Sequence, residues 1–268
     1  ATSIASQADV VVAVLGEAFG MTGEAASRSM IGLPDNQVEL LKALKKTGKP
    51  VVLVLMNGRP LTLSWEDQHL DAILETWYGG TQAGAAISDV LFGKANPAGR
   101  ITMSYPRNVG QIPVYYNAKN TGRPFDNGQK YTTKYLDVAN TPLYPFGYGL
   151  SYSTFTYGDI KLSKETITSG SPITASITVT NSGKYEGEEV VQLYIRDLVG
   201  SVTRPVLELK GYQKISLKKG ESRELKFQIT TEDLKFVNSD LKWITEPGDF
   251  KVFIGPNSRD TKEAAFKL

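Results

Sequence analysis

The sequence predicts a two-part fold, an α/β half followed by an all-β half. The first half alternates strand and helix patterns, which is typical of βαβ units with right-handed crossovers. The second half alternates apolar and polar residues with period two between turn signals, which is typical of a β-sandwich. A chain of 268 residues with 41% hydrophobic residues is long enough for two domains that each bury a core.

The first half begins with a strand and a helix. Residues 10–15 form a continuous branched apolar run, which predicts a parallel-sheet strand covered on both faces. Apolar residues recur at helical spacing after Asp35, which we expect to cap a helix, and Gly48 is expected to end it. A glycine-rich loop, residues 16–28, separates the two elements.

The alternation continues through two more strands and one more helix. Residues 50–56 and 72–77 are short apolar runs, closed by Asn-Gly and Gly-Gly turns. Residues 81–92 place apolar side chains on one side of a predicted helix that ends at a glycine. Short loops between these elements favour a parallel sheet.

The middle of the chain changes character. Residues 106–149 are rich in proline, asparagine, glycine and tyrosine and show little periodicity. The segment is too aromatic for a flexible linker, so we expect an ordered connector that packs against a partner surface. The predicted domains are therefore residues 1–105 and 150–268, joined by this connector.

The last part is predicted to be all strand. Apolar side chains alternate with polar ones over residues 173–179 and again over residues 250–254. Turn signals between such runs indicate a seven-strand sandwich of roughly 100 residues. They lie at residues 181–183, 219–221 and 247–249.

Composition removes several classes of function. The net charge is +2, from 30 Lys+Arg against 28 Asp+Glu, so we expect no nucleic-acid partner. Apolar runs stay far below the ~20 residues that a membrane helix needs, so we expect no membrane partner. The chain has no cysteine and one histidine, His69, which we interpret as a surface or capping residue, so we expect no metal and no cofactor.

The loop after the first strand carries the candidate chemistry. It holds two carboxylates, Glu17 and Glu24, and the cation Arg28, at the sheet end where α/β folds bind ligands. Its glycines are too widely spaced for a dinucleotide loop, and its glutamates would repel a phosphate. A loop glutamate can act as general acid in a neighbouring cleft; it can equally be a solvated residue or, for Glu17, a buried partner of Arg28.

Five segments, in this order along the chain, resemble glycoside hydrolase family 3. They lie at residues 16–28, 49–60, 77–80, 89–99 and 144–152, so the resemblance covers nearly the whole chain. It is greatest to bacterial periplasmic β-glucosidases, in which a (β/α)8 barrel precedes the other domains. The resemblance implies an α/β sandwich with βαβ units followed by a fibronectin type III-like β-sandwich, with a barrel of ~250 residues upstream of this chain.

The resemblance also implies roles for individual residues. In the family the nucleophile is an aspartate of the barrel, and the general acid/base is a glutamate on a loop of the second domain. By motif the acid/base maps to Glu24, with Glu17 as the alternative. Phe19 and Met21 are candidates for substrate contacts, and packing within the loop is an equal alternative. Arg28 is expected to support the loop.

The function that the resemblance implies is retaining hydrolysis of terminal non-reducing β-D-glucosyl residues, with a β-glucoside or oligosaccharide as substrate. The fragment alone is expected to be inactive, because one carboxylate cannot form the covalent intermediate. The resemblance further implies a periplasmic or secreted location and allows a homodimer. The alternative from another class is a non-catalytic carbohydrate-binding or scaffolding fragment.

Overall fold

The computed structural model describes residues 1–168 and 170–268, which form two compact units. The first unit comprises residues 1–94, 104–114 and 137–144, and the second comprises residues 95–103, 115–136 and 145–268. The predicted connector, residues 106–149, is therefore shared between the two units. No helix in the described part of the chain is long and apolar enough to cross a membrane.

Backbone hydrogen bonds explain why the connector divides. In the first unit, Tyr105 N donates to the carbonyl of Tyr144 and Leu143 N donates to the carbonyl of Tyr105, both at 2.8 Å. In the second unit, Ile101 N donates to the carbonyl of Tyr148 at 2.9 Å. Segments that are distant in sequence pair within each unit, which a boundary drawn from composition does not anticipate.

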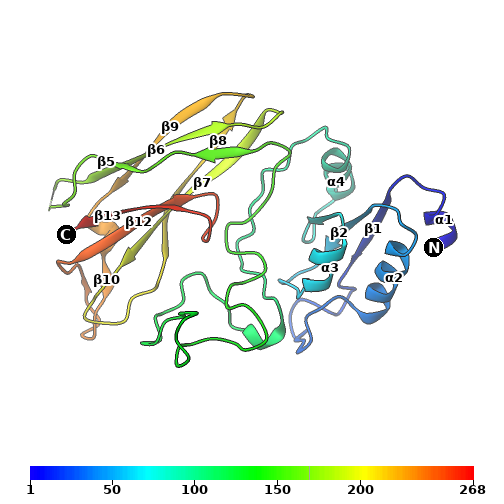
Figure 1. Cartoon of the computed structure of the whole chain (residues 1–268), viewed down its shortest axis with the longest axis horizontal. Helices are drawn as coiled ribbons and strands as arrows, with labels where there is room; N and C mark the ends of the chain where they lie inside the picture. Colours follow the sequence, from blue (N-terminus) through cyan, green and yellow to red (C-terminus); the bar gives the residue numbers. More distant parts are fainter. Residues whose placement is uncertain (169) are drawn as a thin grey trace. The chain divides into compact units, whose positions relative to one another are not determined.

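The first unit is built on a parallel sheet with the strand order β1-β2-β3 (Figure 1). Its strands are β1 (Val11–Gly16), β2 (Val51–Met56) and β3 (Ala72–Glu75). Its helices are α1 (Thr2–Ala5), α2 (Asp35–Lys45), α3 (Ser64–His69), α4 (Ala83–Leu91) and the 3₁₀ turn η1 (Val109–Gln111). The three predicted strands and both predicted helices are confirmed. Helix α3 was not anticipated, because its short and mostly polar sequence has no apolar periodicity.

Helix α2 packs on β1 and β2 through its apolar side. Leu41 and Leu44 are buried, as the helical spacing predicts. Gly48 follows the helix with a φ of 76°, a conformation that favours glycine, and the predicted stop is confirmed. The predicted cap was wrong. Pro34 occupies the N-cap position and Asp35 is the first helical residue, where its charge is still favourable.

The expectation that the first strand is covered on both faces was also wrong. Along β1, Ala13 is buried, whereas Val12 and Val14 are 46% and 56% exposed. Val54, which pairs with Val14 on the central strand, is fully buried. The exposed valines therefore lie on the edge strand β1, beside a central strand whose Val54 is covered. The sequence did not reveal this exposure, because exposed and buried valines look alike in an apolar run.

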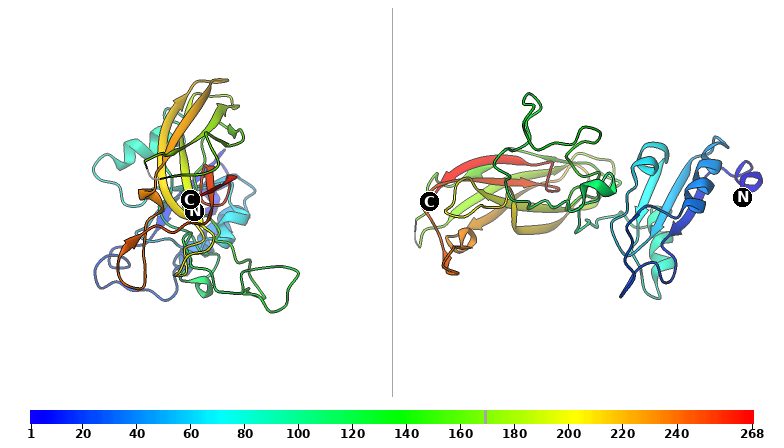
Figure 2. Two further views of the ribbon diagram at one scale, coloured as in Figure 1. Left: turned by 90° about the vertical axis from the view of Figure 1, so that its left-hand side faces the viewer. Right: turned by 90° about the horizontal axis from the view of Figure 1, so that it is seen from below.

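The second unit is a β-sandwich of two four-stranded sheets with a short additional pair (Figure 2). One sheet has the order β13-β12-β7-β8, and in the other β6 pairs with β4, β5 and β9. The strands are β4 (Phe155–Tyr157), β5 (Lys161–Leu162), β6 (Ile173–Asn181), β7 (Gly187–Asp197), β8 (Glu208–Leu217), β9 (Ser222–Ile229), β10 (Phe236–Val237), β11 (Trp243–Ile244), β12 (Asp249–Gly255) and β13 (Lys262–Lys267), with the 3₁₀ turn η2 (Glu232–Leu234).

The core of the second unit lies between its two sheets and confirms the predicted period-two alternation. Alternate side chains of β6 and β12 meet there with side chains of the other strands. The buried members on these two strands are Ile173, Ala175, Ile177, Val179, Phe250, Val252 and Ile254. The turns expected between runs fall between β6 and β7, between β8 and β9, and directly before β12.

The aromatic residues of the predicted connector divide into buried and exposed groups. In the second unit, the rings of Tyr116 and Phe146 stack with centroids 4.2 Å apart, and Tyr116 meets the buried Tyr194 edge-on at 5.9 Å. Tyr115 and Tyr131 are instead largely exposed. The expected packing is therefore present for part of the segment only.

Candidate functional site

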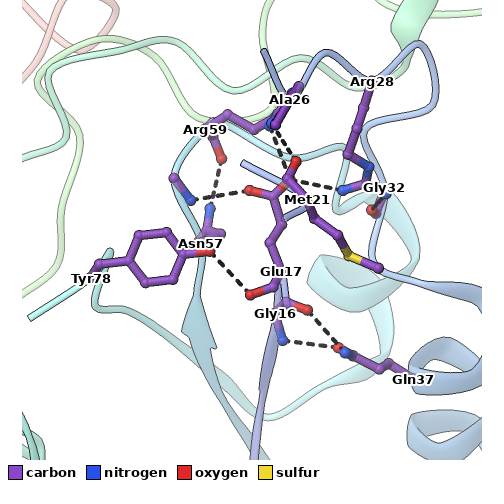
Figure 3. A network of polar contacts seen from close by, with 11 residues as sticks. Gly16, Glu17, Met21, Ala26, Arg28, Gly32, Gln37, Asn57, Arg59 and Tyr78 are labelled. Carbon is purple, nitrogen blue, oxygen red and sulfur yellow. Dashed lines mark hydrogen bonds and ion pairs between the residues drawn. The ribbon is translucent and has the colours of Figure 1, made fainter. Parts of the chain in front are cut away.

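The candidate site is the loop that follows β1 at the carboxyl end of the parallel sheet (Figure 3). Gly16 has a φ of 149°, and a Cβ there would lie 1.7 Å from the carbonyl oxygen of Met56, so only glycine fits. The side-chain amide of Gln37 on α2 accepts from Gly16 N and donates to Gly16 O, both at 2.9 Å. The neighbouring strand and α2 together fix where the loop starts.

Glu17, the next residue, is a buried anion. Its side chain is fully buried, and Oε1 lies 2.9 Å from Nη1 of Arg28 and 2.9 Å from Nε of Arg59 (Figure 3). The N–H of Gly58 donates to Oε2 at 3.1 Å. Two guanidinium groups and one amide therefore compensate the charge, which would be costly to bury alone. The pairing of Glu17 with Arg28 that the sequence suggested is present.

Two further side chains tie this ion-pair cluster to the rest of the first unit. Nη2 of Arg28 donates to the carbonyl of Gly32 at 3.0 Å, beyond the end of the loop. The hydroxyl of Tyr78, from the segment after β3, donates to the backbone carbonyl of Glu17 at 3.1 Å. Burial and the nearby Glu17 charge raise the pKa of Tyr78, which keeps its hydroxyl protonated as a donor.

Glu24 lies on a tight turn in the middle of the loop and is exposed. Ala26 N donates to the carbonyl of Gly23 at 3.3 Å across this turn. Gly23 and Ala25 have φ values of 109° and 57°, and the latter is unfavourable for an alanine. Among the residues that the structure describes, the Glu24 carboxyl takes part in no hydrogen bond or ion pair. Such backbone strain beside an exposed carboxylate is typical of functional loops.

The loop also carries the two predicted sugar-contact residues. Phe19 is fully exposed, and Met21 is partly buried. Met21 N donates to the carbonyl of Ala18 at 3.0 Å, so Phe19 lies in a turn that comes between β1 and the Glu24 turn in sequence. Glu24, Phe19 and Met21 thus share one loop, whereas Glu17 is withdrawn beneath it.

Sequence reasoning missed Arg59. It follows β2 in the turn Asn57-Gly58-Arg59, and Nη2 donates to the carbonyls of Met21 at 2.6 Å and Ala26 at 2.8 Å. No spacing rule links an arginine to a loop more than thirty residues earlier in the chain. The available signal was the Asn-Gly turn at the carboxyl end of the neighbouring strand, the edge where parallel strands gather their loops.

Sequence reasoning also missed Glu75, the last residue of β3. It accepts from Trp77 N at 2.9 Å and from the hydroxyl of the buried Tyr105. Burial raises the pKa of the Glu75 carboxyl against the opposing effect of these hydrogen bonds. Trp77 has a φ of 50°, so the bond to its N–H helps to hold a strained backbone. The Trp77 side chain is partly buried beside Tyr105, with ring centroids 6.2 Å apart.

The remaining predicted features lie away from the loop. His69 is exposed at the end of α3, where Nδ1 lies 2.7 Å from the carbonyl of Trp65 and the two rings stack 4.6 Å apart. This is the surface and capping position that the sequence suggested. The described residues contain no group of three or more histidine, aspartate or glutamate side chains arranged to hold a metal ion.

Comparison with known proteins gives two family matches. Residues 1–152 match the glycosyl hydrolase family 3 C-terminal domain, and residues 189–258 match the fibronectin type III-like domain. The chain is 56% identical over its full length to the periplasmic β-glucosidase of Salmonella typhimurium, of which it spans 35%. It is 45% identical over 97% of its length to a β-xylosidase of Formosa agariphila, again spanning 35% of that protein.

A solved structure shows the same arrangement of elements. The β-glucosidase from Listeria innocua, in complex with gluconolactone, superimposes with a TM-score of 0.95 at 41% identity, over 99% of this chain and 37% of that one. The chain thus spans about a third of the length of the relatives that it matches. The α/β unit, the sandwich and the first family match agree, and the chain belongs to glycoside hydrolase family 3 as a C-terminal part of such a protein.

Proposed function

We propose that this chain is the C-terminal part of a retaining β-glucosidase, in which Glu24 is the general acid/base and the nucleophile lies on a barrel encoded upstream. The main support for assigning this role to Glu24 is the contrast between the two loop carboxylates. Glu24 is exposed on a strained turn, whereas the Glu17 side chain is fully buried between Arg28 and Arg59. A proton donor must reach the substrate, and Glu24 alone of the two is accessible.

The division of labour follows from the chemistry of retention. A retaining glycosidase needs two carboxyl groups about 5 to 5.5 Å apart on either side of the scissile bond. In the first step the nucleophile bonds to the anomeric carbon, the bond to the leaving oxygen breaks, and the Glu24 proton passes to that oxygen. In the second step the Glu24 carboxylate takes a proton from water as the water oxygen displaces the nucleophile.

Phe19 and Met21 would contact the leaving sugar in this arrangement. Both lie on the Glu24 loop, and Phe19 is fully exposed. An aromatic face packs well against the apolar face of a pyranose ring, and such contacts orient the glycosidic oxygen toward the acid. Arg28 would support the loop through Glu17 and the carbonyl of Gly32.

The proposed substrate class is a β-glucoside or oligosaccharide with a terminal non-reducing β-D-glucosyl residue. Similarity to β-glucosidases of Salmonella typhimurium and Listeria innocua supports it, while the Formosa agariphila relative makes β-xylosides the alternative. Parallel assays of the complete protein with 4-nitrophenyl β-glucoside and β-xyloside decide between them. The similarity to a periplasmic relative supports a location in the periplasm or outside the cell, and a homodimer stays a prediction.

The sharpest test of the acid/base is Glu24→Gln in the complete protein. Loss of a proton donor should slow a substrate with a poor leaving group by roughly 10² to 10⁴-fold, in the range that general acid catalysis supplies. A substrate with a good leaving group needs little protonation, so its first step should be far less affected. Azide should then restore turnover of that second substrate, since an external anion replaces the missing base.

Glu17→Gln is the matched control, because it removes the other carboxylate of the same loop. We expect it to lower stability through the unpaired arginines, without azide rescue. Azide rescue at Glu17 rather than at Glu24 would move the role to Glu17. Full turnover by the 268-residue chain alone would contradict the proposed two-part site.

A further inference from the structure

We infer that Arg59 is a positioning residue for Glu24, holding the acid/base turn in place from the neighbouring strand; this rests on the proposed function of Glu24. Nη2 of Arg59 donates to the carbonyls of Met21 at 2.6 Å and Ala26 at 2.8 Å (Figure 3). These two carbonyls flank Glu24 on either side along the chain. A single guanidinium nitrogen therefore closes the segment that carries the proposed proton donor.

The Arg59 guanidinium is itself fixed. Its Nε lies 2.9 Å from Oε1 of the fully buried Glu17, as an ion pair. The side-chain amide of Asn57 donates to the backbone carbonyl of Arg59 at 2.6 Å, which holds the turn after β2. Arg59 is thus attached to a buried anion through its side chain and to Asn57, the residue after β2, through its backbone carbonyl. A planar guanidinium can hold several acceptors in fixed directions, whereas an ammonium is a flexible point charge.

Gly58, in the same turn as Arg59, has no side chain and so allows the Glu24 loop to approach closely. A Cβ at Gly58 would lie 2.4 Å from Oγ1 of Thr22 and 3.1 Å from Cε2 of Tyr78. Its N–H also donates to Glu17 Oε2 at 3.1 Å. The turn Asn57-Gly58-Arg59 is therefore fitted to the loop through a close backbone approach, a buried anion and two carbonyl contacts. This fit gives a role to the Asn57-Gly58-Arg59 turn, which the proposed acid/base chemistry does not itself require.

The two hydrogen bonds from Arg59 matter because the Glu24 side chain has no partner of its own among the described residues. Its position depends on the backbone of the turn between Gly23 and Ala26, which includes the strained Ala25. Acid catalysis requires the donor within hydrogen-bond reach of the leaving oxygen, and a misplacement of about 1 Å can cost about 10²-fold in rate. Releasing the two carbonyls would free the turn to move by such an amount.

The test compares Arg59→Lys with Arg107→Lys in the complete protein. Arg107 is a matched control, because its Nε donates to the carbonyl of Thr141 at 2.9 Å in the same unit, away from the loop. We expect Arg59→Lys to lower kcat for a poor leaving group by about 10-fold or more, with about 3-fold or less for a good one and KM nearly unchanged. Hydrogen exchange should quicken in the peptide covering residues 18–27. Arg107→Lys should change neither readout.

Gly58→Ala provides a second route if Arg59→Lys does not fold. It keeps every charge but pushes Thr22 away, so the same leaving-group dependence should appear with smaller size. The inference is overturned if exchange quickens in residues 18–27 while both substrates slow equally, because Arg59 would then serve stability alone. It is also overturned if neither variant changes exchange or leaving-group dependence while Glu24→Gln shows the acid defect. If Glu24→Gln lacks that defect, the proposed function itself fails and the positioning role falls with it.

Discussion

The two units build their sheets from similar apolar runs and cover them differently. In the second unit, Ile177 and Val179 on β6 are buried against the opposite sheet of the sandwich. In the first unit, Val12 and Val14 on β1 are about half exposed. Ala13 between them is buried, and α2 packs against this strand. In the sandwich each sheet covers the inner face of the other, whereas one face of the edge strand β1 has no covering layer. An apolar run therefore predicts a strand, and only the fold decides what covers it.

The two units also differ in the partners of the buried carboxyl groups on their strands. The Glu189 carboxyl on β7 has its pKa raised by burial, but Arg100 lies 2.9 Å away and opposes the shift. The pKa of Glu75 at the end of β3 is likewise raised by burial, and its hydrogen-bond partners Tyr105 and Trp77 N–H are uncharged. The second unit pairs the buried Glu189 with a cation, whereas the first unit surrounds Glu75 with neutral donors and pairs its other buried carboxylate, Glu17, with two arginines.

The largest expected effect comes from one substitution made in both units. Val252→Thr on β12 buries a hydroxyl in a closed apolar core and should cost about 1 to 3 kcal/mol of the free energy of unfolding. Val12→Thr on β1 keeps the branched shape at an exposed position and should stay within about 0.5 kcal/mol. Calorimetric or denaturant unfolding of the complete protein measures both. Equal losses would show that β1 is covered in the complete protein.

The second prediction concerns pH and is smaller. Because burial raises the pKa of Glu75, its contribution to stability is fully present below the reference value of 4.5 and is lost as pH rises through its folded value. Glu75→Gln removes this titration. The thermal midpoint of the native protein minus that of the variant should therefore fall with rising pH above about 4.5.

Glu189→Gln is the control for this measurement. The opposing effect of Arg100 should give it a weaker pH dependence, in addition to a constant loss from the unpaired arginine. A difference for Glu75→Gln that does not vary with pH would contradict the burial of a neutral carboxyl at that position.

The smallest effect on stability is expected from Val14→Lys, which should nonetheless change the surface. The uncovered valines of β1 form an apolar patch on this 268-residue chain, so the isolated chain should bind an apolar fluorescent dye such as ANS. The variant should lower dye fluorescence while leaving the unfolding midpoint nearly unchanged. Unaltered fluorescence would place the accessible apolar surface elsewhere, for example at the exposed Phe92.

The sequence predicted those parts of the fold that depend on local patterns. Period-two alternation gave the sandwich strands, helical spacing gave α2 with Leu41 and Leu44 inward, and Gly48 marked its end. The cap at Asp35 failed because proline can occupy the N-cap when its backbone is extended there. These features are determined by residues that are close together in the sequence.

The candidate site was predictable only in part. The loop and its two glutamates follow directly from the strand before them, and Arg28 lies close enough in sequence to be paired with Glu17. Arg59 and Tyr78 reach the loop from the segments that follow β2 and β3, because parallel strands bring their carboxyl ends to one edge. Such contacts depend on strand order and register, which residue spacing does not contain. The role of Glu24 stays a prediction until the substitution is made.

The cluster around Glu17 constrains how this protein can diverge. A lineage that lost the carboxylate at this position would leave Arg28 and Arg59 repelling each other in a confined space, whereas a lineage that lost Arg59 would keep Arg28 and the Gly58 N–H as partners of the carboxylate. Loss of the carboxylate is therefore the more costly change, so an uncharged residue at position 17 should occur among homologues only where position 28 or 59 has also lost its cation. Recombination that joins β1 and β2 from different parents should succeed only when the residues at positions 17, 28 and 59 are compatible.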